Sequence, residues 1–150
     1  MNSSADAIFV RRPTSGEEEL LAAHRSAALE ESGRYRGEPW SPTDDLASDA
    51  TVVLVAGVGV TVMASVEAAQ QGRSGRWWIR HVHVEERARE VGLGDAMMLA
   101  VTSEVARCGG TWIGASAQPG DRSLKNLYER HGLVARTILV GRAVEPRPAE

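Results

Sequence analysis

The chain has 150 residues, of which 43% are apolar and 25% are charged. This is the length of one ordinary domain, with enough apolar residues for one core. Its formal net charge of −3 gives no overall positive field, so we expect neither nucleic acid nor a membrane surface as a partner. The single cysteine, Cys108, excludes an internal disulfide and a cysteine-based metal cluster, and we expect a buried, inert thiol.

No segment of the sequence indicates a signal peptide or a membrane span. The first residues, Met1 to Asp6, are polar, and the longest apolar run, Val52 to Val62, contains two glycines and is too short to cross a bilayer. We therefore expect a soluble, cytoplasmic protein. The four histidines are scattered without the spacing of metal ligands, so we expect no bound metal.

The first half of the chain predicts a strand, a helix and a strand meander. The apolar stretch Ala7–Val10 reads as a strand, and Thr14 or Ser15 can cap a helix over Glu17–Glu31, whose first turn is acidic. Further on, β-branched runs separated by glycine-containing turns predict three consecutive antiparallel strands. The three strands are expected over Thr51–Ala56, Val60–Ala68 and Trp77–Val84, and a loop is expected over Ser32–Pro42, after the first helix.

The second half of the chain alternates helices and strands. From Gly92 to Arg107 the apolar residues recur at helical spacing. A strand over Thr111–Ala117, a helix over Ser123–His131 and a last strand over Val134–Val144 follow. This order predicts an α/β (α+β) fold, in which a mixed, mostly antiparallel sheet carries helices on both faces. We expect residues 1–150 to form one domain with a core over about 7–144.

The segment from Val82 to Asp95 gives the strongest functional signal. A predicted strand runs into a glycine-containing loop and directly into a helix, whose free backbone N–H groups can bind an anion. The segment is not a Walker loop, because no lysine is followed by Ser or Thr, and Gly92–Met97 lacks the third glycine of a dinucleotide fingerprint. A glycine-rich turn without any ligand is the alternative interpretation of this segment alone.

Two motifs together resemble those of the GNAT superfamily of N-acetyltransferases. Arg89-Glu90-Val91-Gly92-Leu93-Gly94 is similar to its R/Q-x-x-G-x-G/A signature, and Leu127–Leu133 resembles its LYE-x-x-G-F element. With the order of elements, the resemblance covers Ala7 to about Val144. The chain departs from the family pattern twice: Asp121 stands where an asparagine is common, and one long final strand replaces the usual pair.

The resemblance implies a sheet that is splayed between its fourth and fifth strands, with acetyl-coenzyme A in the gap as co-substrate. It assigns the general acid to Tyr128, whose hydroxyl would protonate the departing thiolate. The alternative role of this tyrosine is to pack a helix against the sheet. The residues implied to bind the coenzyme are Val82, His83, Val84, Arg89, Glu90, Val91, Gly92, Leu93, Gly94, Asp95 and Asp121, with Arg87 as a further candidate.

The general base is not identified by the sequence. GNAT enzymes often use a Glu or His of the fourth strand, but the corresponding positions here are Trp78 and Arg80. His81 and His83 alternate to the opposite face of the strand unless a β-bulge intervenes. A neutral amine would need no base. The remaining candidates, acting through a water molecule, are Glu30 and Glu31.

The resemblance implies a primary amine of a small molecule or peptide as acceptor, and a homodimer is possible. A coenzyme-binding regulatory module without catalysis stays open as an alternative, and acetylation of charged tRNA is disfavoured by the acidic charge balance. The acceptor pocket is expected between the first helix, the loop after it and the turn near Gln70. Its candidate aromatic and acidic contacts are Tyr35, Trp40, Trp77, Trp78, Glu31, Glu38, Asp44 and Asp45.

Overall fold

The fold was obtained as a computed structural model, which describes residues 7–35 and 50–149. Five strands and three α-helices make up this part of the chain. The strands are β1 (Ile8–Arg11), β2 (Thr51–Val58), β3 (Thr61–Gln70), β4 (Arg76–Val84) and β5 (Trp112–Gly114). The helices are α1 (Glu18–Ser32), α2 (Leu93–Arg107) and α3 (Arg122–Arg130), and the 3₁₀ turns η1 (Ser15–Glu17) and η2 (Glu86–Ala88) precede α1 and α2.

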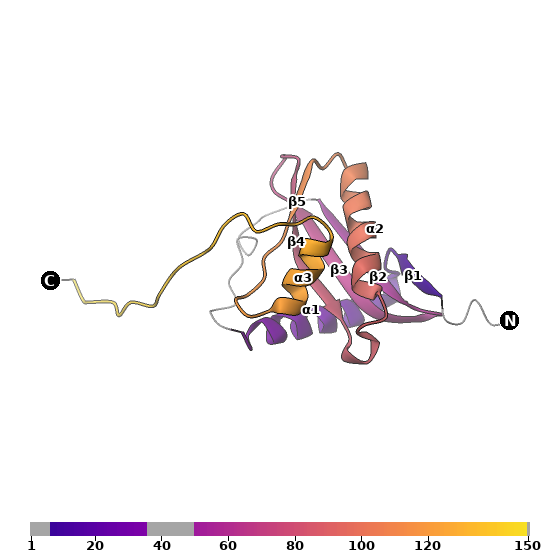
Figure 1. The fold of residues 1–150 in the computed structure, drawn as a ribbon, viewed down its shortest axis with the longest axis horizontal. Coiled ribbons are helices and arrows are strands. Elements are labelled where there is room, and N and C mark those ends of the chain that lie inside the picture. The colour runs from indigo at the N-terminus through magenta and orange to yellow at the C-terminus, as the bar shows by residue number, and fades with distance from the viewer. Residues whose placement is uncertain (1–6, 36–49, 150) are drawn as a thin grey trace.

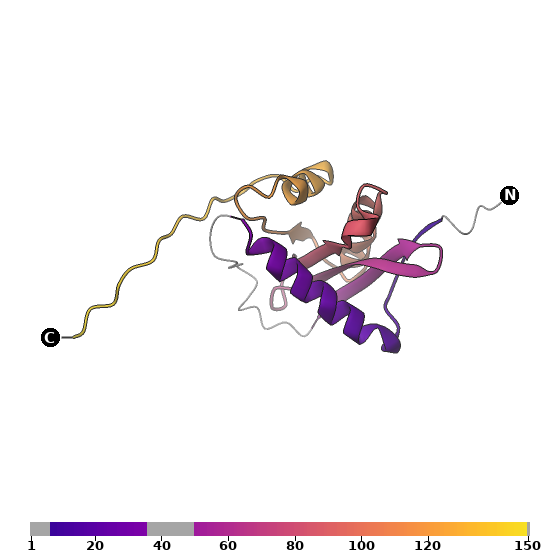
Figure 2. The same ribbon diagram turned by 90° about the horizontal axis from the view of Figure 1, so that it is seen from below.

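The strands form one sheet in the order β1-β2-β3-β4-β5. Neighbours from β1 to β4 are antiparallel, and β5 is parallel to β4. Helix α1 lies on one face of the sheet, and α2 and α3 lie on the other (Figure 1 and Figure 2). This mixed, mostly antiparallel sheet with helices on both faces confirms the predicted fold class.

The main apolar core lies between α2 and the sheet. Helix α2 buries a stripe that includes Leu93, Met97, Val101 and Val105, spaced three to four residues apart, as expected of an amphipathic helix. The stripe belongs to the same cluster as the alternate residues of β2 and β3 that face it. Each of these large side chains contributes about 1.5–3 kcal/mol by leaving water, so this layer holds the start of α2 firmly against the sheet.

The sheet opens beyond the first residues of β4. Strand β5 pairs only with Arg76–Trp78, which makes it shorter than the predicted Thr111–Ala117. Within the described part of the chain, β5 does not extend along the last residues of β4, 81–84. Their backbone groups therefore border a gap between β4 and the chain that follows β5. The predicted splay between the fourth and fifth strands is thus confirmed.

A β-bulge in β4 changes which side chains face α1. Glu67 of β3 is paired with His81, whereas the next residue, Ala68, is paired with Ile79. Arg80 is therefore an extra residue, and the alternation of the strand is shifted after it. Before the bulge Trp77 and Ile79 belong to the α2-side core, and after it Val82 and Val84 pack on that core. His81 and His83 consequently lie beneath α1.

Two predictions are wrong. Residues 134–149 form no helix or strand, although a strand was expected over Val134–Val144, and the tail leaves the body as an extended chain (Figure 1). Its apolar pattern favours a strand, but a strand exists only with a hydrogen-bonded neighbour, and the tail pairs with none of the described strands. Cys108 is exposed rather than buried, because it is the C-cap of α2 and lies beyond the last turn that packs on the sheet.

None of the helices among the described residues is both long and apolar enough to span a lipid bilayer.

Candidate active site

A cavity of about 950 Å³ occupies the open side of the sheet. It is bounded by the C-terminal half of α1, the free edge of β4, the start of α2 and the inner face of α3. The motif residues 89–95 and the helix that carries Tyr128 therefore meet around one space. The residues predicted from the sequence to bind the coenzyme or to act as acid line it, except Val91, which is half-exposed, and the further candidate Arg87.

The start of α2 is shaped by two glycines. Gly92 is the N-cap residue and has a φ of 92°, in the left-handed region that a side chain disfavours. A Cβ atom on Gly94 would lie 3.4 Å from two methyl carbons of Leu127, so α3 packs directly on this turn. The first N–H groups of a helix have no partner within it, and the helix dipole adds partial positive charge there. The turn can therefore bind an anionic group.

The motif arginine holds the loop in place. Arg89 donates a hydrogen bond of 3.1 Å from Nε to the carbonyl oxygen of Val84, and its guanidinium also pairs with Glu31 of α1. Arg87 instead pairs with Glu85, at 3.1 Å. Both contacts are exposed, so each contributes little stability. In this structure Arg89 anchors the loop to β4 and α1, and half of its side chain remains accessible for a second, anionic partner.

The two aspartates of the predicted coenzyme site have partners of their own. Asp95 accepts hydrogen bonds from His131 Nε2 at 2.7 Å and from Arg130, and these bonds lower the pKa of its carboxyl. This contact ties the first turn of α2 to the end of α3. Asp121 caps α3 by accepting a 3.2 Å hydrogen bond from the Leu124 N–H. The carboxylates position the helices, and both residues line the cavity.

Tyr128 is buried on α3 and lines the cavity. Burial raises the pKa of its hydroxyl, and the nearby negative charge of Asp121 raises it further. Both effects favour the neutral phenol. The hydroxyl therefore remains protonated at neutral pH and keeps a proton that it can donate.

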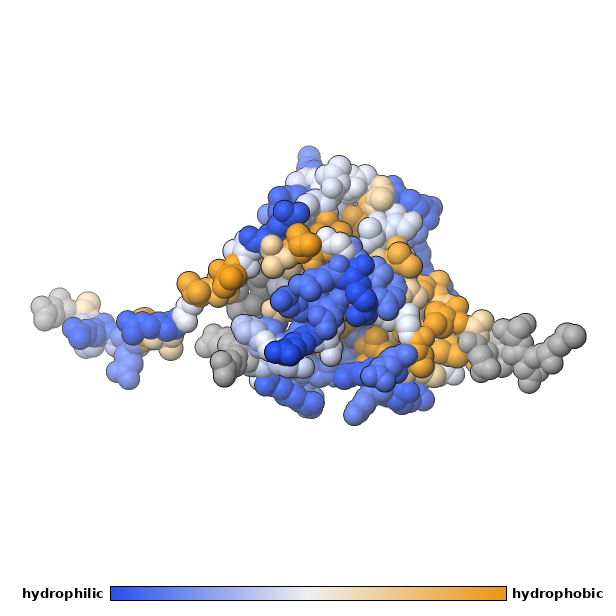
Figure 3. Space-filling model, viewed as in Figure 1, coloured by the Kyte–Doolittle hydropathy of each residue, from blue (hydrophilic) through white to orange (hydrophobic). Residues whose placement is uncertain are grey.

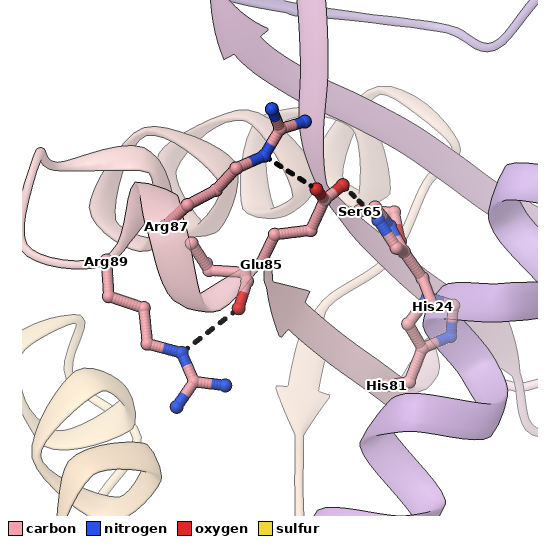
Figure 4. A network of polar contacts seen from close by, with 7 residues as sticks. His24, Ser65, His81, Glu85, Arg87 and Arg89 are labelled. Atoms are coloured by element: carbon pink, nitrogen blue, oxygen red, sulfur yellow. Dashed lines mark hydrogen bonds and ion pairs between the residues drawn. The ribbon is translucent and has the colours of Figure 1, made fainter.

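A group of polar side chains lies beneath α1, where the bulge places the histidines. His24 of α1 is hydrogen-bonded to Ser65 Oγ through Nδ1 (2.8 Å) and to Glu85 through Nε2 (3.1 Å) (Figure 4). Ser65 Oγ is also hydrogen-bonded to His81 Nε2, at 3.2 Å. Burial lowers the pKa of His81 to about 4, against the opposing charge of Glu67. The imidazole of His81 is therefore neutral at physiological pH.

Glu67 and His83 complete this polar group. The Glu67 carboxylate accepts two hydrogen bonds from Arg25 of α1, at 2.9 and 2.6 Å, and lies 3.8 Å from His81 Nδ1. The ring of His83 packs on that of His24 with centroids 4.9 Å apart. Burial lowers the pKa of His83, and the neighbouring His24 lowers it further. Glu67, His81 and His83 all line the cavity, so titratable groups are available at its α1 side.

A protein-family model described as "Acetyltransferase (GNAT) family" matches residues 17–133. This match spans more than half of the chain, including the cavity and both motifs. The chain belongs to the acetyltransferase (GNAT) family. The enzyme class predicted from the motifs, an N-acetyltransferase that uses acetyl-coenzyme A, is that of the family. No curated protein sequence matches the chain.

Solved structures share the fold of this GNAT chain at low sequence identity. The aminoglycoside N-acetyltransferase AAC(6')-Iy in complex with CoA is 10% identical, with a TM-score of 0.71, and the match covers 96% of this chain and 99% of that one. A predicted acetyltransferase from Clostridium acetobutylicum with acetyl-CoA is 17% identical, with a TM-score of 0.66 and coverage of 91% and 96%. A transcriptional regulator from Bacillus halodurans C-125 is 17% identical, with a TM-score of 0.67 and coverage of 92% and 100%.

The acceptor side of this GNAT site differs in part from the sequence prediction. Tyr35 and Glu31 line the cavity, as expected. Trp77 does not, because it is buried at the end of α2, where it packs with the α2-side core. Trp78 stacks edge-on against Trp112, with ring centroids 4.9 Å apart, and is outside the lining. Trp40, Glu38, Asp44 and Asp45 lie outside the described residues.

Sequence reasoning missed three of the polar residues at the α1 side. His24 lies within the helix predicted over Glu17–Glu31, and Ser65 and Glu67 lie within the strand predicted over Val60–Ala68, but none of the three is among the predicted site residues. A signal was present, because a Ser and a Glu two residues apart on a strand of otherwise apolar residues face the same side. Polar groups on a buried face need partners: His24 and His81 provide them for Ser65, and Arg25 provides them for Glu67.

Proposed function

We propose that this GNAT enzyme transfers an acetyl group from acetyl-coenzyme A to a primary amine of a small molecule or peptide. One observation carries the proposal: a single cavity joins an anion-binding helix start, a free strand edge and a buried, protonated tyrosine. The helix start suits the diphosphate of the co-substrate, the strand edge suits its amide-containing arm, and the tyrosine suits the departing thiolate. The acceptor would enter from the α1 side.

In this proposal the coenzyme residues are those at the start of α2 and on β4. The backbone N–H groups of Arg89 to Asp95 would bind the diphosphate, aided by the positive end of the helix dipole. The free edge of β4 at Val82 and Val84 would hydrogen-bond the arm as an added strand would. The carbonyl of Val84 keeps a second lone pair beside the Arg89 bond, so the arm and the arginine do not exclude one another.

The acetyl group would be transferred by direct attack of the amine, without an acetylated enzyme residue. The amine attacks the thioester carbonyl carbon, the carbon–sulfur bond breaks, and the Tyr128 hydroxyl gives its proton to the departing sulfur. Cys108, the one cysteine of the sequence, is exposed and does not line the cavity. This position supports direct transfer over a route through a cysteine.

The proposal is tested by acetyl-coenzyme A binding and by thiol release with a panel of amines. We expect calorimetry to show binding of the co-substrate, and one class of amine (amino acid, polyamine, aminoglycoside or peptide) to accelerate thiol release. The product of the best amine should gain one acetyl group by mass spectrometry. Tight coenzyme binding without any accelerating amine would contradict enzymatic transfer and favour the coenzyme-sensing module instead.

We also propose that the enzyme forms a homodimer through its C-terminal tail. The tail is extended and exposes Ile138, Leu139 and Val140, and Figure 3 shows apolar side chains on the tail outside the body of the molecule. Strand β5 ends the sheet, so its outer edge can accept another strand. If the tail of each copy pairs with β5 of the other copy, the tail and the outer edge of β5 both gain hydrogen-bonded partners, and the dimer is symmetric.

A further inference from the structure

An ion pair between α1 and β3 forms part of the cavity wall. Arg25 of α1 donates to the Glu67 carboxylate of β3 from Nε (2.9 Å) and from Nη2 (2.6 Å). Both residues line the cavity. The Glu67 side chain is only 10% exposed, whereas that of Arg25 is 48% exposed. The pair therefore holds the guanidinium in place and leaves part of it accessible to a ligand.

Arg25 keeps hydrogen-bonding capacity beyond this pair. A guanidinium carries five N–H groups in a planar fork. Two of them bond to Glu67, and within the described part of the chain the other three, on Nη1 and Nη2, have no hydrogen-bonded partner. At the end of the fork Nη1 and Nη2 each carry one of two parallel N–H groups, which is the edge that binds a carboxylate with two hydrogen bonds. Arg25 is therefore able to bind a second carboxylate, that of a ligand in the cavity.

The carboxylates at the α1 side of the cavity already have cationic partners. Glu67 lies between two guanidiniums, because its other oxygen is 3.8 Å from Arg80 Nη1. Glu31 is paired with Arg89. Among the described residues at this side, two arginines thus accompany one carboxylate, and the excess charge is positive. This balance favours an acceptor with an anionic group and disfavours one with several ammonium groups, such as a polyamine.

Arg25 lies close to where the thioester would be. In the proposed function the diphosphate binds at residues 89–95 and the arm runs back along β4 from Val84, so the thioester end of the co-substrate lies towards His81. His81 is directly opposite Glu67 in the pairing of β3 with β4. Since Arg25 is bonded to Glu67, its guanidinium lies beside the same end. A carboxylate bound by Arg25 would therefore hold an amine on the adjacent carbon near the acetyl group.

The cavity wall beyond Arg25 is apolar. Ala28 and Leu29 on the next turn of α1, and Tyr35 after the helix, line the cavity. Leu29 is 60% exposed, so an apolar group of a ligand can remove its side chain from water. A molecule that combines a carboxylate, an amine and an apolar side chain matches the guanidinium, the thioester end and this wall.

We propose that the acceptor is an amino acid with an apolar side chain, whose carboxylate is bound by Arg25. The inference rests on the proposed acetyl transfer and specifies its acceptor. Arg25 would bind the carboxylate with two charge-assisted hydrogen bonds, and this contact would orient the α-amine towards the acetyl group. Glu67 is a positioning residue in this arrangement, because it holds the guanidinium from its other edge.

Leucine and leucinamide are the matched probes, because they differ only in the carboxylate. We expect Arg25→Gln in the full chain to lower kcat/KM for leucine by about 10- to 100-fold and to leave that for leucinamide nearly unchanged. Comparing the ratio of the two values between wild type and variant cancels the different basicities of the amines. Arg34→Gln is the control and should behave as wild type. Arg34 is also paired with a glutamate, Glu30, but it lies outside the cavity lining.

A second variant separates substrate binding from a merely structural role of the ion pair. Glu67→Gln breaks the pair as well, but it retains Arg25. If Arg25 only ties α1 to the sheet, both variants should lower kcat/KM for leucine and leucinamide alike. If Arg25 binds the carboxylate, Glu67→Gln keeps the preference for leucine and Arg25→Gln loses it. Equal losses for the two amines in Arg25→Gln, wild-type rates with leucine in that variant, or a polyamine as the best acceptor would each overturn the inference.

Calorimetry tests the carboxylate site without turnover. With coenzyme A present, we expect the wild type to bind N-acetylleucine about tenfold more tightly than N-acetylleucinamide, and Arg25→Gln to bind the two equally. Equal affinities in the wild type would contradict the carboxylate site. Failure of the proposed function looks different: no amine would release thiol with the wild type, whereas failure of this inference alone leaves an active enzyme that prefers an amine without a carboxylate.

Discussion

At the scale of single residues, Tyr128 is the proposed general acid. It is buried, lines the cavity and keeps its proton because burial raises its pKa. We expect Tyr128→Phe, which retains the ring and removes only the hydroxyl, to lower kcat of thiol release by about 10²-fold. The affinity for acetyl-coenzyme A should stay within about twofold, measured by calorimetry.

The pH dependence of Tyr128 follows from the same shift. Since the pKa of the phenol is raised, the hydroxyl stays protonated over the whole range in which the protein can be assayed, and rates should not decline through its ionisation below about pH 10. Weakened coenzyme binding in Tyr128→Phe, with an unchanged rate at saturation, would contradict its role as acid and assign the hydroxyl to binding instead.

Burial of His81 predicts a loss of stability in mild acid. Its pKa is lowered from 6.5 to about 4 by burial, so between these values the unfolded chain binds a proton that the folded chain does not. Stability is therefore complete above about pH 6.5, falls as the pH decreases towards 4, and levels off below it. At about 1.4 kcal/mol for each pH unit between the two pKa values, the loss is about 3 kcal/mol.

Urea unfolding at a series of pH values measures this loss. We expect the slope of unfolding free energy against pH between about 6.5 and 4 to decrease in His81→Asn, because the group that titrates is removed. His83, whose pKa burial also lowers, and carboxyls with lowered pKa values, such as that of Glu85, contribute to the slope that remains. A slope that is the same in His81→Asn and wild type would show that His81 is not neutral in the folded protein.

At the scale of elements, the two ends of α2 offer a matched pair of glycines. Gly92 precedes the helix and Gly109 follows it, with φ values of 92° and 83°. An added Cβ has no neighbour within 4 Å at Gly109 and only a methyl carbon at 3.7 Å at Gly92. Alanine at either position should therefore cost a similar amount, about 1–2 kcal/mol of unfolding free energy, from the left-handed backbone alone.

Coenzyme binding should separate the two glycine variants. Gly92→Ala disturbs the turn whose N–H groups are proposed to bind the diphosphate, so we expect acetyl-coenzyme A affinity to fall by about tenfold or more, which is about 1.4 kcal/mol. Gly109→Ala, at the far end of the helix and outside the cavity lining, should bind as wild type does. Equal affinities in the two variants would place the diphosphate elsewhere.

The elements also show what the sequence could predict. The helices and the meander were predicted because their periodicity is local, and the loop 89–95 because its motif is local too. The bulge at Arg80 depends on how β4 aligns with β3, which no local pattern specifies. It reverses the faces of His81 and His83, and places them with the polar side chains beneath α1. The roles of Ser65 and Glu67 could not be predicted without that alignment.

At the scale of the whole molecule, the C-terminal tail is an apolar segment whose side chains remain exposed. Ile138 and Val140 are each 86% exposed, although they belong to a β-branched, alternating segment. The sequence predicted a strand there from this pattern alone. A pattern of residues can specify the tendency to form a strand, but the partner edge is set by tertiary or quaternary structure. The proposed exchange with β5 of a second copy would supply it.

Removal of the tail tests the proposed dimer. We expect the full chain to be dimeric by light scattering and a chain ending at Leu133 to be monomeric, because the pairing segment is gone. The cavity lining ends at Arg130, so the shortened chain should still bind acetyl-coenzyme A. If the full chain is monomeric, hydrogen exchange of the tail amides decides between the remaining possibilities. Slow exchange at 137–140 would mean that the tail pairs with β5 of its own copy. Fast exchange there would contradict any strand in the tail.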